Sequence, residues 1–152
     1  MAGLERWRAR VTAGLQARGQ AAFARFVRKR TDQQLDRTVG TDTGLRMIFN
    51  GMERTFRPDQ SAGIRADIQY ELRVDGQPKR WVVRIVDRTI RTGPGVSPNP
   101  ALILRMALPT FARIIAGEVA APQAFMDGKI QMEGDGQLAL RMPEMFGQVV
   151  ST

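Results

Sequence analysis

The chain of 152 residues contains no cysteine and no histidine. Without cysteine no disulfide framework can form, and without either residue type zinc, haem and iron–sulfur sites are not expected. The side chain best suited to proton transfer near neutral pH is missing as well. We therefore expect no metal, no cofactor and no enzymatic activity.

Two further absences narrow the function. Serine occurs only at Ser61, Ser97 and Ser151, never in the G-x-S-x-G pattern of serine hydrolases, and there is no G-x-x-x-x-G-K-[ST] phosphate loop. No apolar run approaches the ~18 residues of a membrane span, and residues 1–30 lack the contiguous apolar core of a secretory signal. These absences favour a cytoplasmic protein. Catalysis by carboxylates alone is the remaining enzymatic alternative, but no pair of carboxylates stands out.

The positive charge is concentrated at the N-terminus. Residues 1–30 hold eight of the 23 basic residues and one of the 15 acidic residues, so the other 122 residues carry 15 bases against 14 acids. Apolar residues recur in this arm at helical spacing, for example at Leu4, Trp7, Val11 and Leu15. We expect a basic amphipathic helix, with Gly14 and Gly19 as weak points.

Three interpretations of this arm remain open. Its apolar stripe packs on the domain or on a second copy of the chain, or the arm docks on an anionic membrane surface. Nucleic acid is the least favoured partner, because no recognised motif accompanies the charge. The residues expected to contact a membrane are Arg6, Trp7, Arg10, Arg25, Arg28, Lys29 and Arg30.

The pattern after residue 30 predicts two helices and then a hairpin. Thr31-Asp32 and Thr41-Asp42 are helix caps, and the second helix ends before Pro58. From residue 64 to 75 apolar and polar residues alternate, which predicts a long strand with one face exposed to water. Asp75-Gly76 turns the chain into a second strand over 79–87. Shorter strands are expected at 89–92 and 101–107.

The glycine-rich stretch 123–142 reads QAFMDGKIQMEGDGQLALRM. A phosphate loop would need a lysine and a long following helix, and a calcium loop would need more oxygen ligands than Glu133 and Asp135 supply. The glycines therefore separate small elements: a helical turn ending at Gly128, a fifth strand over 129–133, and a last helix that Pro143 kinks or splits.

This C-terminal region resembles the sterol carrier protein 2 (SCP2) family. The stretch AFMDGKIQMEGDGQLALRMPEMF, preceded by FARIIAGEVAAPQAF, is similar to the family's small-Phe pair, Gly-Lys, short strand, Gly-Asp and Leu-Ala-Leu helix. The resemblance implies an α+β fold: a five-stranded, mostly antiparallel sheet covered by helices, with an apolar tunnel between them. We expect residues 1–40 to be a basic helical extension and residues 41–152 to be the SCP2-like domain.

The resemblance also implies a function. Family members bind fatty acids, fatty acyl-CoA, phospholipids, sterols or isoprenoid lipids without chemistry of their own, so we expect a lipid-binding or lipid-transfer protein. The alternative is a membrane-docked accessory or scaffold module, for example in a lipid or quinone biosynthetic assembly, that acts through its basic arm. Whichever function holds, the arm is a possible site of oligomer formation. Met126, Met132, Met142 and Met145 either line a deformable ligand wall or fill gaps in the core. The expected ligand-binding residues are Trp81, Val83, Ile85, Phe111, Ile114, Ile115, Phe125, Met126, Leu138, Leu140, Met142, Met145 and Phe146.

Overall fold

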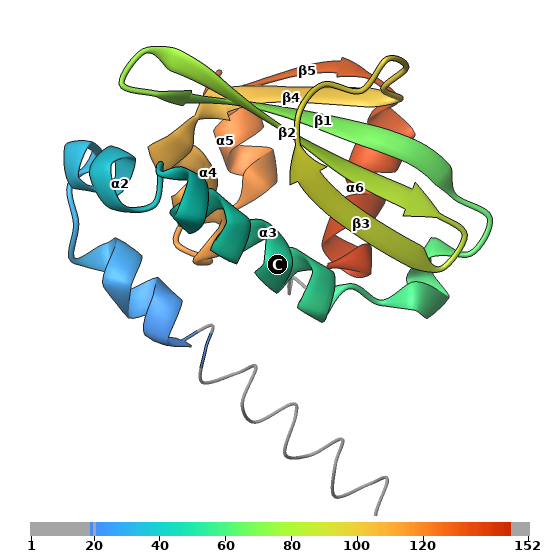
Figure 1. Ribbon diagram of the computed structural model, residues 1–152, viewed down its shortest axis with the longest axis horizontal. Helices are drawn as coiled ribbons and strands as arrows, with labels where there is room; N and C mark the ends of the chain where they lie inside the picture. Colours follow the sequence, from blue (N-terminus) through green and yellow to red (C-terminus); the bar gives the residue numbers. More distant parts are fainter. Residues whose placement is uncertain (1–18, 20, 147–152) are drawn as a thin grey trace, which may run out of the picture.

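The computed structural model describes residue 19 and residues 21–146, which form one sheet covered on a single face by helices (Figure 1). The strand order is β3-β2-β1-β4-β5, and only the central β1–β4 pair is parallel. The expected α+β fold with a mostly antiparallel five-stranded sheet is therefore confirmed. The strands are β1 (Arg65–Val74), β2 (Gln77–Val86), β3 (Thr89–Pro94), β4 (Leu102–Ala107) and β5 (Ile130–Gly134).

The hairpin of β1 and β2 forms where the alternating pattern predicts it. Its ten-residue strands pair in continuous register, and Val74 lies opposite Gln77 across the turn. Asp75 and Gly76 both have positive φ, 50° and 79°. This is the backbone twist that a two-residue hairpin turn requires, and aspartate and glycine tolerate it best.

The helices begin and end at residues suited to these positions. Thr31 caps α2 in a capping box with Gln34, Thr41 caps α3, and the carboxylate of Asp135 accepts hydrogen bonds from the first N–H groups of α6. The helical elements are α2 (Asp32–Thr38), α3 (Asp42–Thr55), the 3-10 helix η1 (Pro58–Ser61), α4 (Leu108–Ile115), α5 (Ala121–Met126) and α6 (Gly136–Met145).

Proline 143 does not split the last helix. The helix α6 runs through Pro143 to Met145, and the N–H of Phe146 still donates to the carbonyl of Met142. Proline lacks the N–H that would bond the carbonyl four residues earlier, and its ring crowds that carbonyl. Of the two expected outcomes, the split into two turns is wrong, because Pro143 stands in the last turn of one continuous helix, and the kink stays a prediction.

The described end of the N-terminal arm packs on the domain. Residues 21–28 are helical, and Val27 is fully buried while Phe23 and Phe26 pack against the core. The next helix, α2, lies against α4 and buries Leu35. The apolar stripe thus continues into the core at this end; residues 1–18 lie outside the described residues. The domain boundary expected at residue 40 stays a prediction.

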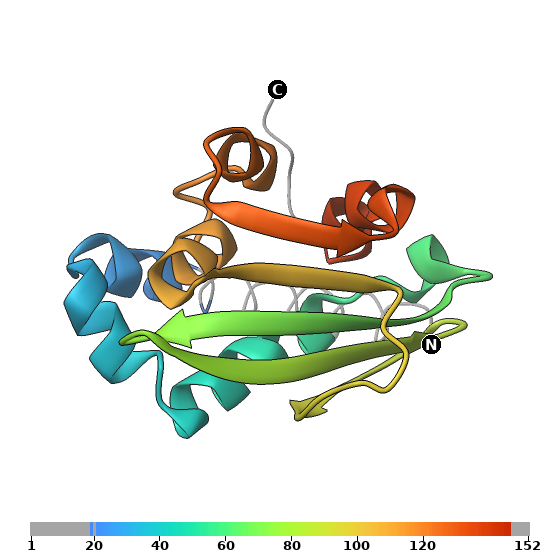
Figure 2. The same cartoon turned by 90° about the horizontal axis from the view of Figure 1, so that it is seen from above.

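The core lies between the sheet and the helices (Figure 1). The side chains of β1, β2 and β4 that face the helices are almost fully buried, and α3 and α4 cover them with Phe49, Leu108 and Phe111. Seen from above in Figure 2, the opposite face of the sheet carries no helix. The fold thus places all its apolar packing on one face, which we call the helix face.

Candidate functional site

Four aromatic side chains meet on the helix face and form what we call the aromatic cluster: Phe49, Tyr70, Trp81 and Phe111. The Phe49 ring stacks on Trp81 at 5.0 Å between centroids and on Phe111 at 5.4 Å, and Tyr70 meets Phe49 and Phe111 edge-on at 5.3 Å. Burial raises the pKa of the Tyr70 hydroxyl, so it remains protonated. The cluster fills the space between α3, α4 and the centre of the sheet.

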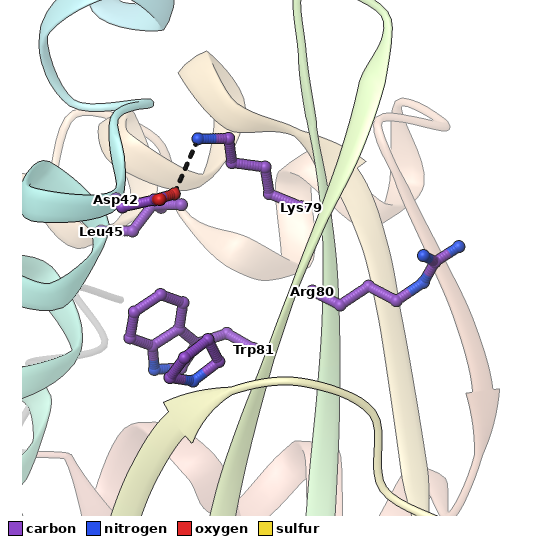
Figure 3. A pocket seen from close by; sticks show the side chains of 6 residues that line it. Asp42, Leu45, Lys79, Arg80 and Trp81 are labelled. Atoms are coloured by element: carbon purple, nitrogen blue, oxygen red, sulfur yellow. Dashed lines mark hydrogen bonds and ion pairs between the residues drawn. The ribbon is translucent and has the colours of Figure 1, made fainter.

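A hollow of about 160 Å³ lies on the solvent side of this cluster, lined by Asp42, Leu45, Lys79, Arg80, Trp81 and Pro94 (Figure 3). The Nζ of Lys79 pairs with Asp42 at 2.9 Å across its rim, whereas Arg80 points away from Trp81 toward the outer face. The indole N–H of Trp81 is buried and makes no hydrogen bond to the residues that the structure describes.

A second hollow, of about 270 Å³, is lined by residues 65–67, 84–86 and Asn99. Neither hollow lies between β5 and the C-terminal helices. The apolar tunnel expected between the sheet and the helices stays a prediction.

The thirteen residues expected to bind ligand fall into three groups by exposure. Phe125, Met126 and Leu140 are exposed, and Ile114, Ile115 and Met142 are half-buried. Trp81 and Phe111 belong to the aromatic cluster, and Met145 and Phe146 lie at the far end of the sheet, where Phe146 meets Phe56 at 5.9 Å. The fully packed group is Trp81, Val83, Ile85, Phe111, Leu138, Met145 and Phe146.

The apolar side chains exposed in the C-terminal third are concentrated on three short elements. Phe125 and Met126 of α5 are 48% and 80% exposed, Met132 of β5 is 37% exposed, and Leu140 of α6 is 75% exposed. The helices α5 and α6 lie at opposite ends of β5, with Met132 between them in the chain (Figure 2). We call these four residues the apolar rim.

Met132 shows where the helix face loses its cover. It is the register partner of Leu104, and Ile130 is the partner of Met106, so all four share the helix face. Leu104 and Met106 are buried, but Met132 is not. The sheet is therefore covered from β2 to β4 and partly uncovered at β5, beside the expected ligand residues of α5.

This fold and this distribution of apolar residues can be compared with known proteins. The family model of the SCP-2 sterol transfer family matches residues 49–147. The chain belongs to this family. A search of curated proteins finds no match.

Solved structures share the SCP-2 fold at low sequence identity. The sterol carrier protein 2-like 2 of Aedes aegypti aligns with a TM-score of 0.56 and 19% identity, over 66% of this chain and 94% of that protein. Its palmitated form, a solution structure, aligns with a TM-score of 0.53 and 20% identity, over 65% and 90%. The stereoselective inverting sec-alkylsulfatase Pisa1 from Pseudomonas sp. aligns with a TM-score of 0.56 and 19% identity over 70% of this chain.

The sulfatase is a much longer protein, and the chain spans 16% of its length. At these identities the likeness concerns the fold alone. The SCP-2 fold therefore occurs both as nearly a whole protein and as a small part of an enzyme.

The outer face of this SCP-2 sheet carries a polar network that the alternating sequence pattern did not reveal. Gln69 is 2% exposed, its amide donates to the carbonyls of Trp81 and Gly95 at 3.1 and 3.0 Å, and its Oε1 accepts from the N–H of Ser97 at 2.7 Å. The segment after β3 thus covers part of β1, so the expectation that this face of the strand is exposed to water is wrong at Gln69. The signal available in the sequence was the proline-rich loop over 93–100, whose position could not be derived.

Two carboxylates of the same face are held in ion pairs. Hydrogen bonds from Arg84, opposed by burial, hold the pKa of Asp67 below its usual value, and Ser97 adds to this effect. Burial alone would raise the pKa of Glu71, but hydrogen bonds from Arg105 and Arg80 bring it below its usual value. Both carboxylates therefore stabilise the sheet, and neither has the raised pKa typical of a catalytic acid.

The described part of the chain holds no group of three or more metal-ligating side chains and no helix that could cross a membrane. Of the residues expected to contact a membrane, Arg6, Trp7 and Arg10 lie outside the described residues. Arg25, Arg28 and Lys29 are exposed, and Arg28 lies 4.0 Å from Glu118. Arg30 sits 3.3 Å above the Phe26 ring and is less available to a surface.

Proposed function

We propose that this SCP-2 domain is a non-catalytic carrier that binds an apolar ligand between the sheet and its C-terminal helices. The candidate ligands are a fatty acid, a fatty acyl-CoA, a sterol or an isoprenoid lipid. The observation that carries this proposal is the uncovered part of the helix face at β5, where Met132 and Phe125 are exposed beside a continuous apolar core. Membership of a sterol transfer family supports it, as does the palmitated form of the Aedes aegypti protein of the same fold.

The apolar chemistry of this region suits a hydrocarbon chain. Each buried methylene contributes about 0.8 kcal/mol, so ~10 buried carbons offer roughly 8 kcal/mol before ordering costs. Micromolar binding then needs little polar recognition. Thioethers are flexible and polarisable, so Met126, Met132 and Met142 can adjust to chains of different shape.

Native mass spectrometry of the purified full-length chain, with added palmitate, palmitoyl-CoA, cholesterol and a prenyl alcohol, tests the carrier function. We expect a one-to-one complex with at least one of these lipids. Failure of the whole panel to bind at high micromolar concentration would contradict the proposal.

A matched pair of variants locates the ligand. Met132→Gln should lower the affinity for the lipid severalfold, because it places a polar amide on the uncovered part of the helix face. Met47→Gln is the control, since Met47 is a more exposed methionine, on the solvent side of α3 and away from the proposed site. Equal weakening by both variants, or by neither, would contradict the proposed location.

A second candidate function is a membrane-docked accessory module. It is favoured by Arg25 and Lys29, which are exposed on the helix of residues 21–28 and the turn after it, while Val27 anchors that helix to the domain. A polybasic surface gains about 1 kcal/mol per basic residue on an anionic membrane. A carrier must also meet a membrane to load, so the two functions are compatible.

Sedimentation with vesicles of phosphatidylcholine and phosphatidylglycerol tests this second function. The double variant Arg25→Glu/Lys29→Glu should lose binding, and the loss should be greatest at low salt. The control Arg37→Glu/Arg73→Glu makes the same change in net charge at exposed positions elsewhere. If both double variants lose binding equally, only net charge matters and this region is not the docking surface.

A further inference from the structure

A single row of apolar side chains crosses the helix face from β2 to β5. The register partners are Trp81, Tyr70, Leu104 and Met132, one from each of four neighbouring strands. Residues in register lie on the same face of a sheet. The row therefore connects the aromatic cluster directly with the apolar rim.

The two ends of this row differ in how firmly they are packed. Trp81 and Tyr70 are 4% and 3% exposed and are covered by the rings of Phe49 and Phe111. Aromatic rings have few rotamers and favourable mutual geometry, so four interlocked rings resist displacement. A ligand that pushed into them would have to break several ring contacts at once.

The other end of the row is packed loosely. The helix α5 has six residues, and Ala124 is the one among them that is buried. On the neighbouring elements, Ile114, Ile115 and Met142 are half-buried and pack against the core, and Met132 of β5 is exposed. Aliphatic and thioether side chains change rotamer more easily than packed rings. A ligand therefore moves the side chains near β5 before it moves the aromatic cluster.

From this asymmetry we propose that the aromatic cluster is the end wall of the ligand site. The site then accepts one flexible acyl chain, laid on the helix face of β4 and β5, and rejects a rigid fused-ring sterol. The strand β5 has five residues and spans about 17 Å, which sets the length of chain that can be sheltered. This inference rests on the proposed carrier function and names its ligand class.

Ligand preference measured by calorimetry on the full-length chain, with palmitate and cholesterol as ligands, tests the end wall. We expect the wild type to prefer palmitate by at least tenfold. Phe111→Leu removes part of the wall and should narrow that ratio at least fivefold by raising affinity for cholesterol. Leu35→Ala, which removes a buried side chain from α2, controls for mere destabilisation and should leave the ratio unchanged.

The outcomes separate the two proposals. If the wild type binds cholesterol as tightly as palmitate, or if Phe111→Leu leaves the ratio unchanged, the end wall is wrong while the carrier function stands. If neither ligand nor any other lipid binds, the carrier function fails and the end wall with it. If Phe111→Leu does not fold, Trp81→Phe is used in its place, because it makes the same wall smaller from the side of β2. It should narrow the ratio of palmitate to cholesterol affinity in the same way.

Discussion

The two ends of the helix face contrast in their cover. Toward β2, the 14-residue helix α3 and the helix α4 hold an aromatic cluster with almost no exposed surface. Toward β5, the short six-residue helix α5 gives less cover, and Phe125, Met126 and Met132 are in contact with solvent. The sheet itself is continuous between them, so the difference comes from the helices and not from the strands.

Under the proposed function, this contrast assigns stability and ligand binding to different regions. Packed aromatic rings bury large areas in fixed geometry and so stabilise one conformation. Exposed thioether and phenyl groups next to the same core contribute little to folding, and they leave apolar surface available to a partner. The comparison predicts a steep gradient in mutational effect along the helix face.

The largest effect is expected at the centre of the aromatic cluster. Phe49→Ala removes a fully buried ring with three aromatic neighbours and should lower the free energy of unfolding by about 3–5 kcal/mol. Phe125→Ala, the same change in the apolar rim, should cost less than about 1 kcal/mol. Urea unfolding measures both, and similar losses would abolish the distinction between the two ends.

The buried amide of the outer face should come next. Gln69→Ala leaves the carbonyls of Trp81 and Gly95 and the N–H of Ser97 without their partner, so we expect a loss of about 2–3 kcal/mol. Gln131→Ala on β5 is the matched control, because Gln131 is exposed. An equally small effect of both changes would mean that the segment after β3 does not pack on β1 in solution.

The pH dependence of stability should show a smaller effect of the ion pairs. Because the folded-state pKa of Asp67 is lowered, its contribution is complete above its unfolded value of about 3.9 and is lost as the pH falls through the folded pKa. Asp67→Asn should flatten the acid limb of a plot of melting temperature against pH between about 5 and 2. If the acid part of the curve is unchanged, the ion pair between Asp67 and Arg84 contributes little to stability.

The pKa of Asp36 is shifted in the opposite direction, so its effect on stability has the opposite pH dependence. Burial raises its pKa, so folding favours its protonated form and its stabilising effect is lost as the pH rises through that raised value. Asp36→Asn should therefore improve relative stability at neutral pH more than at pH 3, measured in the same series of melting curves. A parallel shift at both pH values would contradict the assigned cause.

The sequence predicted the strands and most helix ends because these depend on local patterns. Alternation over 64–75 and the Asp75-Gly76 turn define the hairpin, and Thr31 and Thr41 cap helices as expected. Of the kink or split expected at Pro143, the split did not occur, because a proline in the last turn leaves most of the helix's hydrogen bonds in place. The resemblance of the C-terminal stretch predicted the family that the family model then matched.

The candidate site was harder to predict because it depends on contacts between distant segments. Phe49 and Tyr70 complete the aromatic cluster, yet they come from a helix and a strand whose juxtaposition no local pattern gives. The sequence does not distinguish an apolar residue that is buried in the core, such as Phe111, from one that is exposed, such as Met126 or Leu140. The burial of Gln69 depends on the loop after β3, which begins 26 residues later in the chain at Gly95.

The methionine methyl groups provide the most direct measurement of the central claim, that an apolar ligand occupies the loosely packed end of the helix face. In ¹³C-methyl spectra of the full-length chain titrated with palmitate, we expect shifts and contacts to the acyl chain at Met132 and Met142. Met52, buried on α3, and Met47, exposed on its far side, should stay unchanged. Shifts centred on Met52, or none at saturating lipid, would contradict the account.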